Sequence, residues 1–230
     1  DRLAQGTILV RRAKPNEPIT TLDGMSRTLS AETLVIADAR SPVAVAGIMG
    51  GTGSEVTPTT TRVLLESALF DPISVRRTAR ALGLVSEASY RFERGVDPIG
   101  VETASARASQ LISELAEGGR CQVCDVGEKP SKRTVIALEP ERMERWLGMR
   151  VPPATIRTTL ARLSCRVASS GAGGALRVSV PTFRNDLTRD VDLYEEVARI
   201  EGYDRVPSTV PSRTIAGSAL EGSAEFHRLQ

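Results

Sequence analysis

Residues 64–98 constrain the fold of this chain more than any other stretch. This stretch begins within an apolar run, residues 63–70, which has the length and branched composition typical of a strand with little exposed surface. A helix is predicted next, because Asp71 supplies an N-cap, Pro72 suits the first helical position and Gly83 ends the pattern. We therefore expect a strand and a helix to pack on one core in this part of the chain.

Glu66 is the one ionisable residue in that apolar run. Removing a carboxylate from water is costly unless a donor compensates for the lost hydration, so Glu66 is expected to have a partner or a ligand. An arginine of the following helix, Arg76, Arg77 or Arg80, could pair with it and give it a purely structural role. The residues alone leave both interpretations open.

The rest of the first half predicts short strands and one long helix. Asp23-Gly24 favours a hairpin with a tight primed turn. The glycine-rich bend at residues 49–54 is typical of a turn, although it would also let backbone N–H groups approach a ligand. The predicted elements are strands at 6–12, 33–39 and 42–48, a hairpin across 19–29, and a helix at 97–117 with one face against a sheet.

The second half predicts a smaller unit after an irregular linker at residues 121–132. The expected elements are a strand at 133–138, helices at 140–147 and 153–163, a hairpin pairing 166–168 with 176–181, and a last helix from about Asp190 to Gly202. The fold class is therefore α+β, a mixed-sheet domain followed by a small winged-helix-like domain. Residues 209–230 lack periodicity and are expected to be a linker or tail.

Charge and composition exclude several classes of function. Basic and acidic residues number 30 and 28, which leaves a net charge of +2, too little for a molecule-wide attraction to nucleic acid. Any RNA contact would be a local patch that includes the arginines of the first helix, unless these side chains are simply solvated. The other candidates for such a patch are Arg91, Arg94, Arg184 and Arg189.

Histidine and cysteine usage argues against a histidine-based active site or a zinc site. The single histidine, His227, lies in the polar tail, so no nucleophile–histidine pair is expected in the body of the chain. Cys121 and Cys124 form a lone C-x-x-C, too few ligands for zinc. No apolar run is long enough to span a membrane, and a cytoplasmic location is expected.

Four ordered segments resemble one protein family: GIMGG at 47–51, LLESALFDPISVRRTARALGL at 64–84, SEASYRFERGVDP at 86–98, and VPTFRNDLTRDVDLYEEVARIEGYDRVPST at 180–209. On these segments the chain resembles the β subunit of bacterial phenylalanyl-tRNA synthetases. The resemblance implies that residues 1–125 are most of the editing module, the combined third and fourth domains, incomplete at the N-terminus. Residues 130–208 would be the fifth domain.

The resemblance implies hydrolytic editing of tyrosine wrongly joined to phenylalanine tRNA, and no aminoacylation by this chain. The matching pocket residues are Gly50, Glu66, Ser86 and Ala88, with Glu66 and the Gly50 N–H holding the phenolic hydroxyl. A pocket histidine of the family would precede Asp1, so the pocket is expected to be incomplete here. The alternative is a non-catalytic module for subunit assembly or RNA binding.

The resemblance also implies magnesium and two macromolecular partners, the catalytic α subunit and phenylalanine tRNA. Asp192, Glu195 and Glu196 share one face of the last helix, Asp186 precedes it, and oxygen-only ligands suit magnesium. The family assigns these four positions to a magnesium ion shared with the catalytic subunit, and we expect no magnesium without that subunit. Alternatively, the acids complement the helix dipole and stay solvated.

Overall fold

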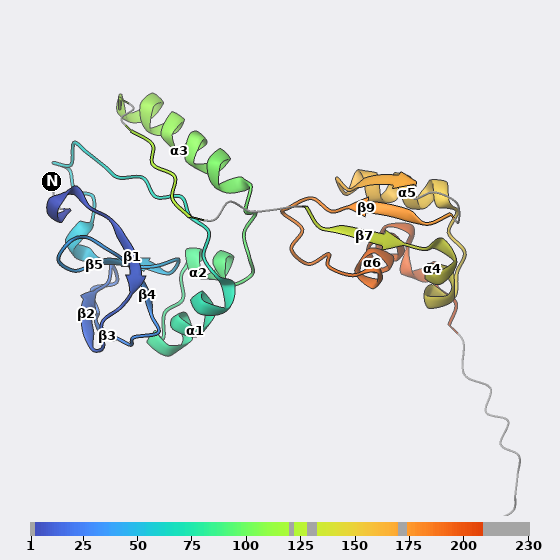
Figure 1. Cartoon of the computed structure of the whole chain (residues 1–230), viewed down its shortest axis with the longest axis horizontal. Coiled ribbons are helices and arrows are strands. Elements are labelled where there is room, and N and C mark those ends of the chain that lie inside the picture. The colour runs from blue at the N-terminus through green and yellow to red at the C-terminus, as the bar shows by residue number, and fades with distance from the viewer. Residues whose placement is uncertain (1–2, 120–121, 128–132, 170–173, 209–230) are drawn as a thin grey trace, which may run out of the picture.

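The computed structural model describes residues 3–119, 122–127, 133–169 and 174–208 (Figure 1). In the first half, an antiparallel four-stranded sheet has the order β1-β4-β5-β6. Its strands are β1 (Leu9–Arg12), β4 (Leu34–Ala37), β5 (Pro42–Val45) and β6 (Met49–Gly50), with short 3-10 turns at Ala4–Gly6 and Thr52–Ser54. The strands predicted at 6–12, 33–39 and 42–48 are confirmed, each over a shorter range.

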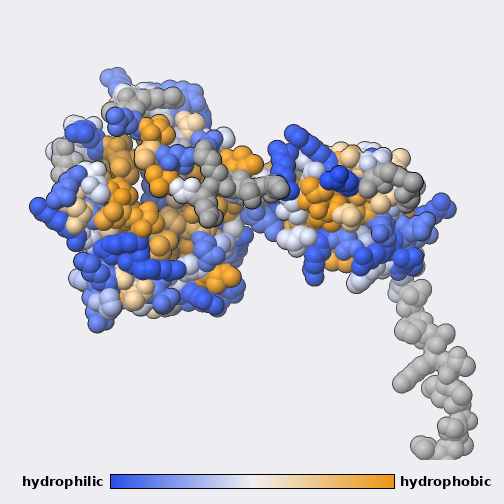
Figure 2. Space-filling view, in the orientation of Figure 1, coloured by the Kyte–Doolittle hydropathy of each residue, from blue (hydrophilic) through white to orange (hydrophobic). Residues whose placement is uncertain are grey.

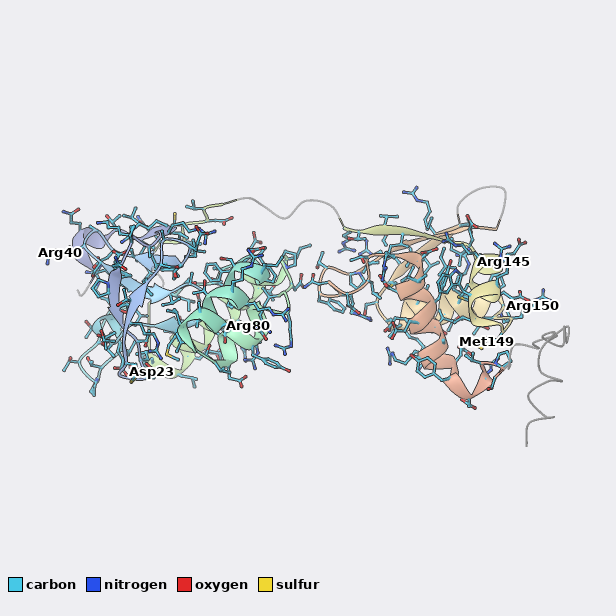
Figure 3. The ribbon with its side chains drawn as sticks, turned by 90° about the horizontal axis from the view of Figure 1, so that it is seen from below. Asp23, Arg40, Arg80, Arg145, Met149 and Arg150 are labelled. Carbon is cyan, nitrogen blue, oxygen red and sulfur yellow. The ribbon has the colours of Figure 1, made fainter. Side chains whose placement is uncertain are left out.

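The predicted hairpin is confirmed as β2 (Glu17–Thr20) and β3 (Ser26–Leu29), but its turn is not the primed type. Thr20 pairs with Ser26, so the loop is longer than a two-residue turn, and Gly24 alone in it has a positive φ, of 80°. The Asp23 carboxylate, labelled in Figure 3, orders this loop by accepting hydrogen bonds from the Thr21 hydroxyl and the Arg27 guanidinium.

The strand predicted at residues 63–70 is wrong. This segment is extended but pairs with no strand in the described part of the chain, and Val63 and Leu64 are 55% and 59% exposed. Only its end is anchored, where Ser67 Oγ donates to Val101 O at 2.9 Å and Phe70 is buried. An apolar run suits a strand only when a partner supplies the other half of the hydrogen-bond ladder, and no partner strand lies beside this one.

Helix α1 (Pro72–Leu82) begins and ends where its sequence predicts. The Asp71 side chain accepts the Ser74 N–H at 2.7 Å, and Gly83 ends the helix in the left-handed conformation with φ 62°. A second helix, α2 (Glu87–Phe92), lies between the helices predicted at 72–82 and 97–117, where the sequence predicted no regular element. The start of this helix is marked by a serine version of the capping box, in which the side chains of Ser86 and Ser89 each accept the backbone N–H of the other residue.

Helix α3 (Gly100–Ala116) is confirmed, but the prediction that one face packs against a sheet is wrong. The helix has no buried residue, and Leu115 is 81% exposed. Its first turn lies over open space rather than over side chains of the sheet, because a cavity separates the two. That cavity is the main feature of the first half.

The second half has every element predicted for it. Strands β7 (Val135–Leu138), β9 (Leu176–Ser179) and β8 (Arg166–Ser169) form an antiparallel sheet in that order. The helices are α4 (Pro140–Leu147), α5 (Pro153–Arg162) and α6 (Asp190–Glu201), followed by a 3-10 turn at Tyr203–Arg205. The α+β fold class is confirmed for both halves. All described strand pairs are antiparallel, so the sheet of the first half is antiparallel and not mixed as predicted.

Each half has its own hydrophobic core. In the first half the core lies between Ala13 and Leu84 in the sequence, and in the second between Ile136 and Ala198. Large apolar side chains also remain exposed on the first half, and they include Leu9, Val10, Val63 and Leu64. Figure 2 shows orange residues at the surface of this half. The domain boundaries at 125 and 130 stay predictions, and residues 209–230 lie outside the described residues.

Candidate functional site

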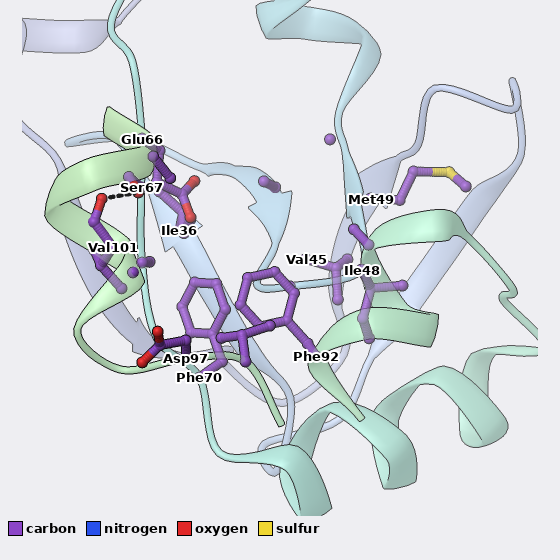
Figure 4. A pocket seen from close by; sticks show the side chains of 18 residues that line it. Ile36, Val45, Ile48, Met49, Glu66, Ser67, Phe70, Phe92, Asp97 and Val101 are labelled. Atoms are coloured by element: carbon purple, nitrogen blue, oxygen red, sulfur yellow. Dashed lines mark hydrogen bonds between the residues drawn. The ribbon is translucent and has the colours of Figure 1, made fainter. Parts of the chain in front are cut away.

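A cavity of about 600 Å³ opens between the sheet, residues 66–70, α2 and the first turns of α3 (Figure 4). Most of its lining is apolar. Glu66 and Asp97 are the ionisable side chains among the described lining residues, and both are acidic. The lining consists of Ile36, Ala44, Val45, Gly47, Ile48, Met49, Gly50, Glu66, Ser67, Ala68, Phe70, Ala88, Phe92, Val96, Asp97, Gly100, Val101 and Ala104.

Glu66 lies in the cavity wall without a protein partner. Its carboxylate makes no hydrogen bond or ion pair within the described residues, and desolvation by the surrounding protein raises its pKa. The alternative interpretation, a structural pairing with Arg76, Arg77 or Arg80, is therefore wrong for the described residues. More than a third of the whole residue is accessible, so the desolvation is local to the carboxyl group. The structure thus offers an acceptor that a ligand could satisfy.

Gly50 and Ala88, two of the other predicted pocket residues, line the same cavity. Gly50 ends β6, and its carbonyl accepts the Leu22 N–H at 3.0 Å. A Cβ at Gly50 would come 3.2 Å from a methyl group of Leu22, so a side chain would force that residue to shift. Ala88 lies on α2, where a larger side chain would extend into the open space.

Ser86 does not line the cavity and instead fixes the start of α2. Its hydroxyl donates to Ile48 O at 2.6 Å and accepts the Ser89 N–H at 3.0 Å. The Ser86 N–H in turn donates to Ser89 Oγ at 2.9 Å. The residue therefore ties α2, which carries Ala88 and Phe92, to the chain just before Gly50.

An aromatic pair that the sequence did not predict lies within the cavity wall. The rings of Phe70 and Phe92 are 5.1 Å apart with their planes tilted by 59°. Gly47, with φ 70°, makes room for them, because a Cβ there would lie 2.9 Å from the Phe70 ring and 3.3 Å from the Phe92 ring. The sequence offers one signal for the position of Phe92, which is its i, i+4 spacing from Ala88. This spacing places the two residues on one face only if residues 87–92 are recognised as a helix.

Three of the acids predicted to bind magnesium are engaged by other groups. Arg184 contacts Asp186 at 2.6 Å and Glu196 at 3.0 Å, and the strong hydrogen bond from Arg184 lowers the pKa of Asp186. Arg199 also contacts Glu196, at 2.7 Å. Asp192 accepts hydrogen bonds from the backbone N–H groups of Thr188 and Arg189, which precede α6. The bond from the Thr188 N–H contributes most to lowering the pKa of Asp192 to about 2.

The fourth acid, Glu195, lies apart, beside Trp146 and Tyr203 in a separate depression. No group of three or more His, Cys, Asp or Glu among the described residues could hold a metal ion. The arrangement therefore does not fit magnesium as it stands, because Arg184 already neutralises two of the acids. Magnesium binding stays a prediction that requires Arg184 to move.

The candidate RNA-contacting arginines fall into two groups. Arg91 pairs with Glu87 at 2.8 Å, and Arg94 lies 3.6 Å from the centre of the Tyr90 ring. The arginines of α1 are exposed, and within the described residues they form no ion pair; Arg80 is labelled in Figure 3. An RNA patch on α1 stays a prediction.

The remaining sequence predictions concern cysteine, histidine and the membrane. Cys124 is an exposed free thiol, whereas Cys121 and His227 lie outside the described residues. No helix in the described part of the chain is both long and apolar enough to cross a membrane.

Comparison with known proteins finds two domain families in the chain. The B3/4 domain matches residues 1–117, and the tRNA synthetase B5 domain matches residues 136–203. The phenylalanine–tRNA ligase β subunit of Moorella thermoacetica is 50% identical over 218 residues, which is 94% of this chain and 27% of that protein. That of Rhodopirellula baltica is 44% identical over 230 residues, 100% of this chain and 34% of that protein.

A solved N-terminal fragment of the phenylalanyl-tRNA synthetase β subunit from Pyrococcus horikoshii is a weaker match. It has a TM-score of 0.44 and 16% identity, over 88% of this chain and 58% of that one. The chain spans about a quarter to a third of the length of the curated relatives described above.

Proposed function

This chain belongs to the B3/4 domain family and corresponds to part of the phenylalanyl-tRNA synthetase β subunit, and we propose that its cavity hydrolyses tyrosine wrongly joined to phenylalanine tRNA. The observation that carries this proposal is the Glu66 carboxylate, which has no partner among the described residues, in a mostly apolar wall. A neutral aromatic ring suits the apolar wall, and a phenolic hydroxyl would supply the donor that Glu66 lacks.

Selection would follow from the cost of an unpaired carboxylate. Tyrosine would donate its hydroxyl to Glu66, whereas phenylalanine would displace water from the carboxylate and return no hydrogen bond. A site built to pair with a hydroxyl can reject the analogue that lacks it by about 10⁴-fold. The Phe70 and Phe92 rings would contact the ring common to both amino acids and would not discriminate between them.

Hydrolysis would use water, because no hydroxyl or thiol of the described lining is free to attack the ester. Ser67 is the one hydroxyl among the described lining residues, and it already donates to Val101 O at 2.9 Å. The water oxygen would add to the ester carbonyl carbon, the bond to the ribose oxygen would break, and that oxygen would take up a proton. Polar groups of the tRNA terminus and of the backbone would position the water.

The test is deacylation of phenylalanine tRNA charged with tyrosine or with phenylalanine. We expect the wild-type protein to release tyrosine faster, and Glu66→Ala, which removes the acceptor, to lower the ratio of the two rates by about 100-fold or more. Glu102→Ala on α3 is the matched control, because Glu102 is exposed and lies outside the cavity lining. Equal ratios for the wild type and Glu66→Ala would overturn the role given to Glu66.

The partners follow from the same proposal. The catalytic α subunit would carry out aminoacylation, phenylalanine tRNA would bring its 3′ end to the cavity, and tyrosine would be the amino acid removed. A magnesium ion shared with the α subunit would need Asp186 and Glu196 to be released from Arg184.

A non-catalytic assembly module is the second candidate, and the exposed apolar side chains of Leu9, Val10, Val63 and Leu64 favour it. Such a surface suits burial against another protein more than hydrolysis. Binding to the catalytic α subunit without any deacylation would support this candidate against the first.

A further inference from the structure

Asp97, the second carboxylate of the cavity, has no role in the function proposed above. It lies in the turn before α3 and is half-buried. One oxygen, Oδ1, accepts the Ile99 N–H at 3.0 Å, and the Asp97 carbonyl accepts the Gly100 N–H at 3.0 Å. No ion pair or further hydrogen bond engages the second oxygen within the described residues.

One hydrogen bond orients the Asp97 side chain, and Gly100 leaves room for it. Its bond to Ile99 closes a short ring within the turn, and a Cβ at Gly100 would come 3.3 Å from Asp97 Cβ. The glycine therefore lets the carboxylate lie close against the start of α3. A carboxylate that one hydrogen bond orients, and whose other oxygen has no partner among the described residues, is suited to bind a cationic group.

The charge of the cavity favours a ligand with a cationic group at one end. The described lining contains two acidic side chains and no basic one. In the view of Figure 4, the Glu66 carboxylate lies above the Phe70 ring, and the Asp97 carboxylate lies beside that ring. The lining thus combines two separate carboxylates with an aromatic surface.

An aminoacyl ester has matching parts. Its α-ammonium group is its one positive charge, its side-chain ring is apolar, and a tyrosyl group adds a hydroxyl at the far end. Resting on the proposed function, which assigns Glu66 to that hydroxyl, we propose that Asp97 binds the α-ammonium group of the aminoacyl substrate. Asp97 would thereby orient the ester, while Glu66 selects the side chain.

The test compares two neutral-amide ligands that differ in the ammonium group, tyrosinamide and 3-(4-hydroxyphenyl)propanamide. We expect the wild-type protein to bind tyrosinamide about 10-fold tighter, because a hydrogen bond to a charged group is worth roughly that factor. Asp97→Asn should bring the ratio of the two dissociation constants close to one. The asparagine keeps an oxygen for the Ile99 N–H, so the turn before α3 should be retained.

Two further variants separate this inference from the proposed function. Asp71→Asn makes the same change at the N-cap of α1, outside the cavity lining, and should leave the ratio unchanged. Glu66→Ala, which removes the acceptor for the phenolic hydroxyl, should keep the ratio of the two dissociation constants but lose the preference for tyrosinamide over phenylalaninamide. Thermal unfolding of each variant verifies that it is folded.

The outcomes are distinct. In the first, the wild-type protein prefers tyrosinamide over phenylalaninamide, while Asp97→Asn leaves unchanged the ratio of the dissociation constants of tyrosinamide and 3-(4-hydroxyphenyl)propanamide. That result would overturn the role of Asp97 and leave the proposed function intact. A wild-type protein without the hydroxyl preference would overturn the proposed function itself. A wild-type protein that binds neither ligand would overturn both.

Discussion

Glu66 and Glu17 show how the same side chain takes opposite roles in one domain. Glu66 has no partner in the described part of the chain, and desolvation raises its pKa. Glu17 is buried in β2, and its hydrogen bonds to Arg11, at 2.7 and 2.8 Å, lower its pKa to about 2 despite burial. The paired carboxylate stabilises the fold, whereas the unpaired one is left for a ligand. That contrast is the residue-scale reason to assign function to Glu66.

The Arg11–Glu17 pair predicts a pH-dependent contribution to stability. The pKa of Glu17 is lower in the folded state than in the unfolded state, so the stabilisation is present above about pH 4.5 and is lost as the pH falls toward about 2. Arg11→Met should lower the free energy of unfolding by about 2 kcal/mol at neutral pH. It should cost much less near pH 2.

Urea unfolding at several pH values measures this effect. Arg40→Met is the matched control, because Arg40 is exposed and forms no ion pair among the described residues. A loss of stability for Arg11→Met that does not change with pH would mean that the arginine acts through packing and not through Glu17.

At the scale of elements, local signals predicted well and non-local ones did not. Asp71, Pro72 and Gly83 determine the ends of α1 through contacts within one turn, so the sequence suffices to predict them. Residues 63–70 failed as a strand because pairing depends on a distant neighbour. Phe70, Phe92 and Asp97 were missed for the same reason, since the chain brings them together only in the folded cavity.

Helix α2 predicts an effect of Ser86 that differs from direct ligand contact. Ser86→Ala should remove both the cap and the hydrogen bond to Ile48 O, at a cost of about 1 kcal/mol, and loosen α2. Ser86→Thr keeps the hydroxyl and should restore the helix. Hydrogen exchange of the α2 amides, measured beside tyrosine binding, reports both effects. Weaker binding by Ser86→Ala with α2 fully protected would mean that Ser86 contacts the ligand.

At the scale of the whole molecule, two cores that share no residue predict two separate unfolding units. Leu193 is fully buried in the second core, and Leu193→Ala should destabilise that half by about 3 kcal/mol. Amides of β7, β9 and α6 should then exchange faster, whereas those of β4 and β5 should not change. Faster exchange in both halves would show that the two units fold as one.

The central claim is that Glu66 recognises a phenolic hydroxyl, and the pKa of its carboxyl group tests that claim most directly. NMR titration of Glu66 should give a pKa above the ordinary glutamate value in the free protein, because desolvation raises it. Tyrosine should lower this pKa by donating a hydrogen bond to the ionised form, and phenylalanine should not lower it. A Glu66 pKa that responds equally to both amino acids, or to neither, would contradict the account.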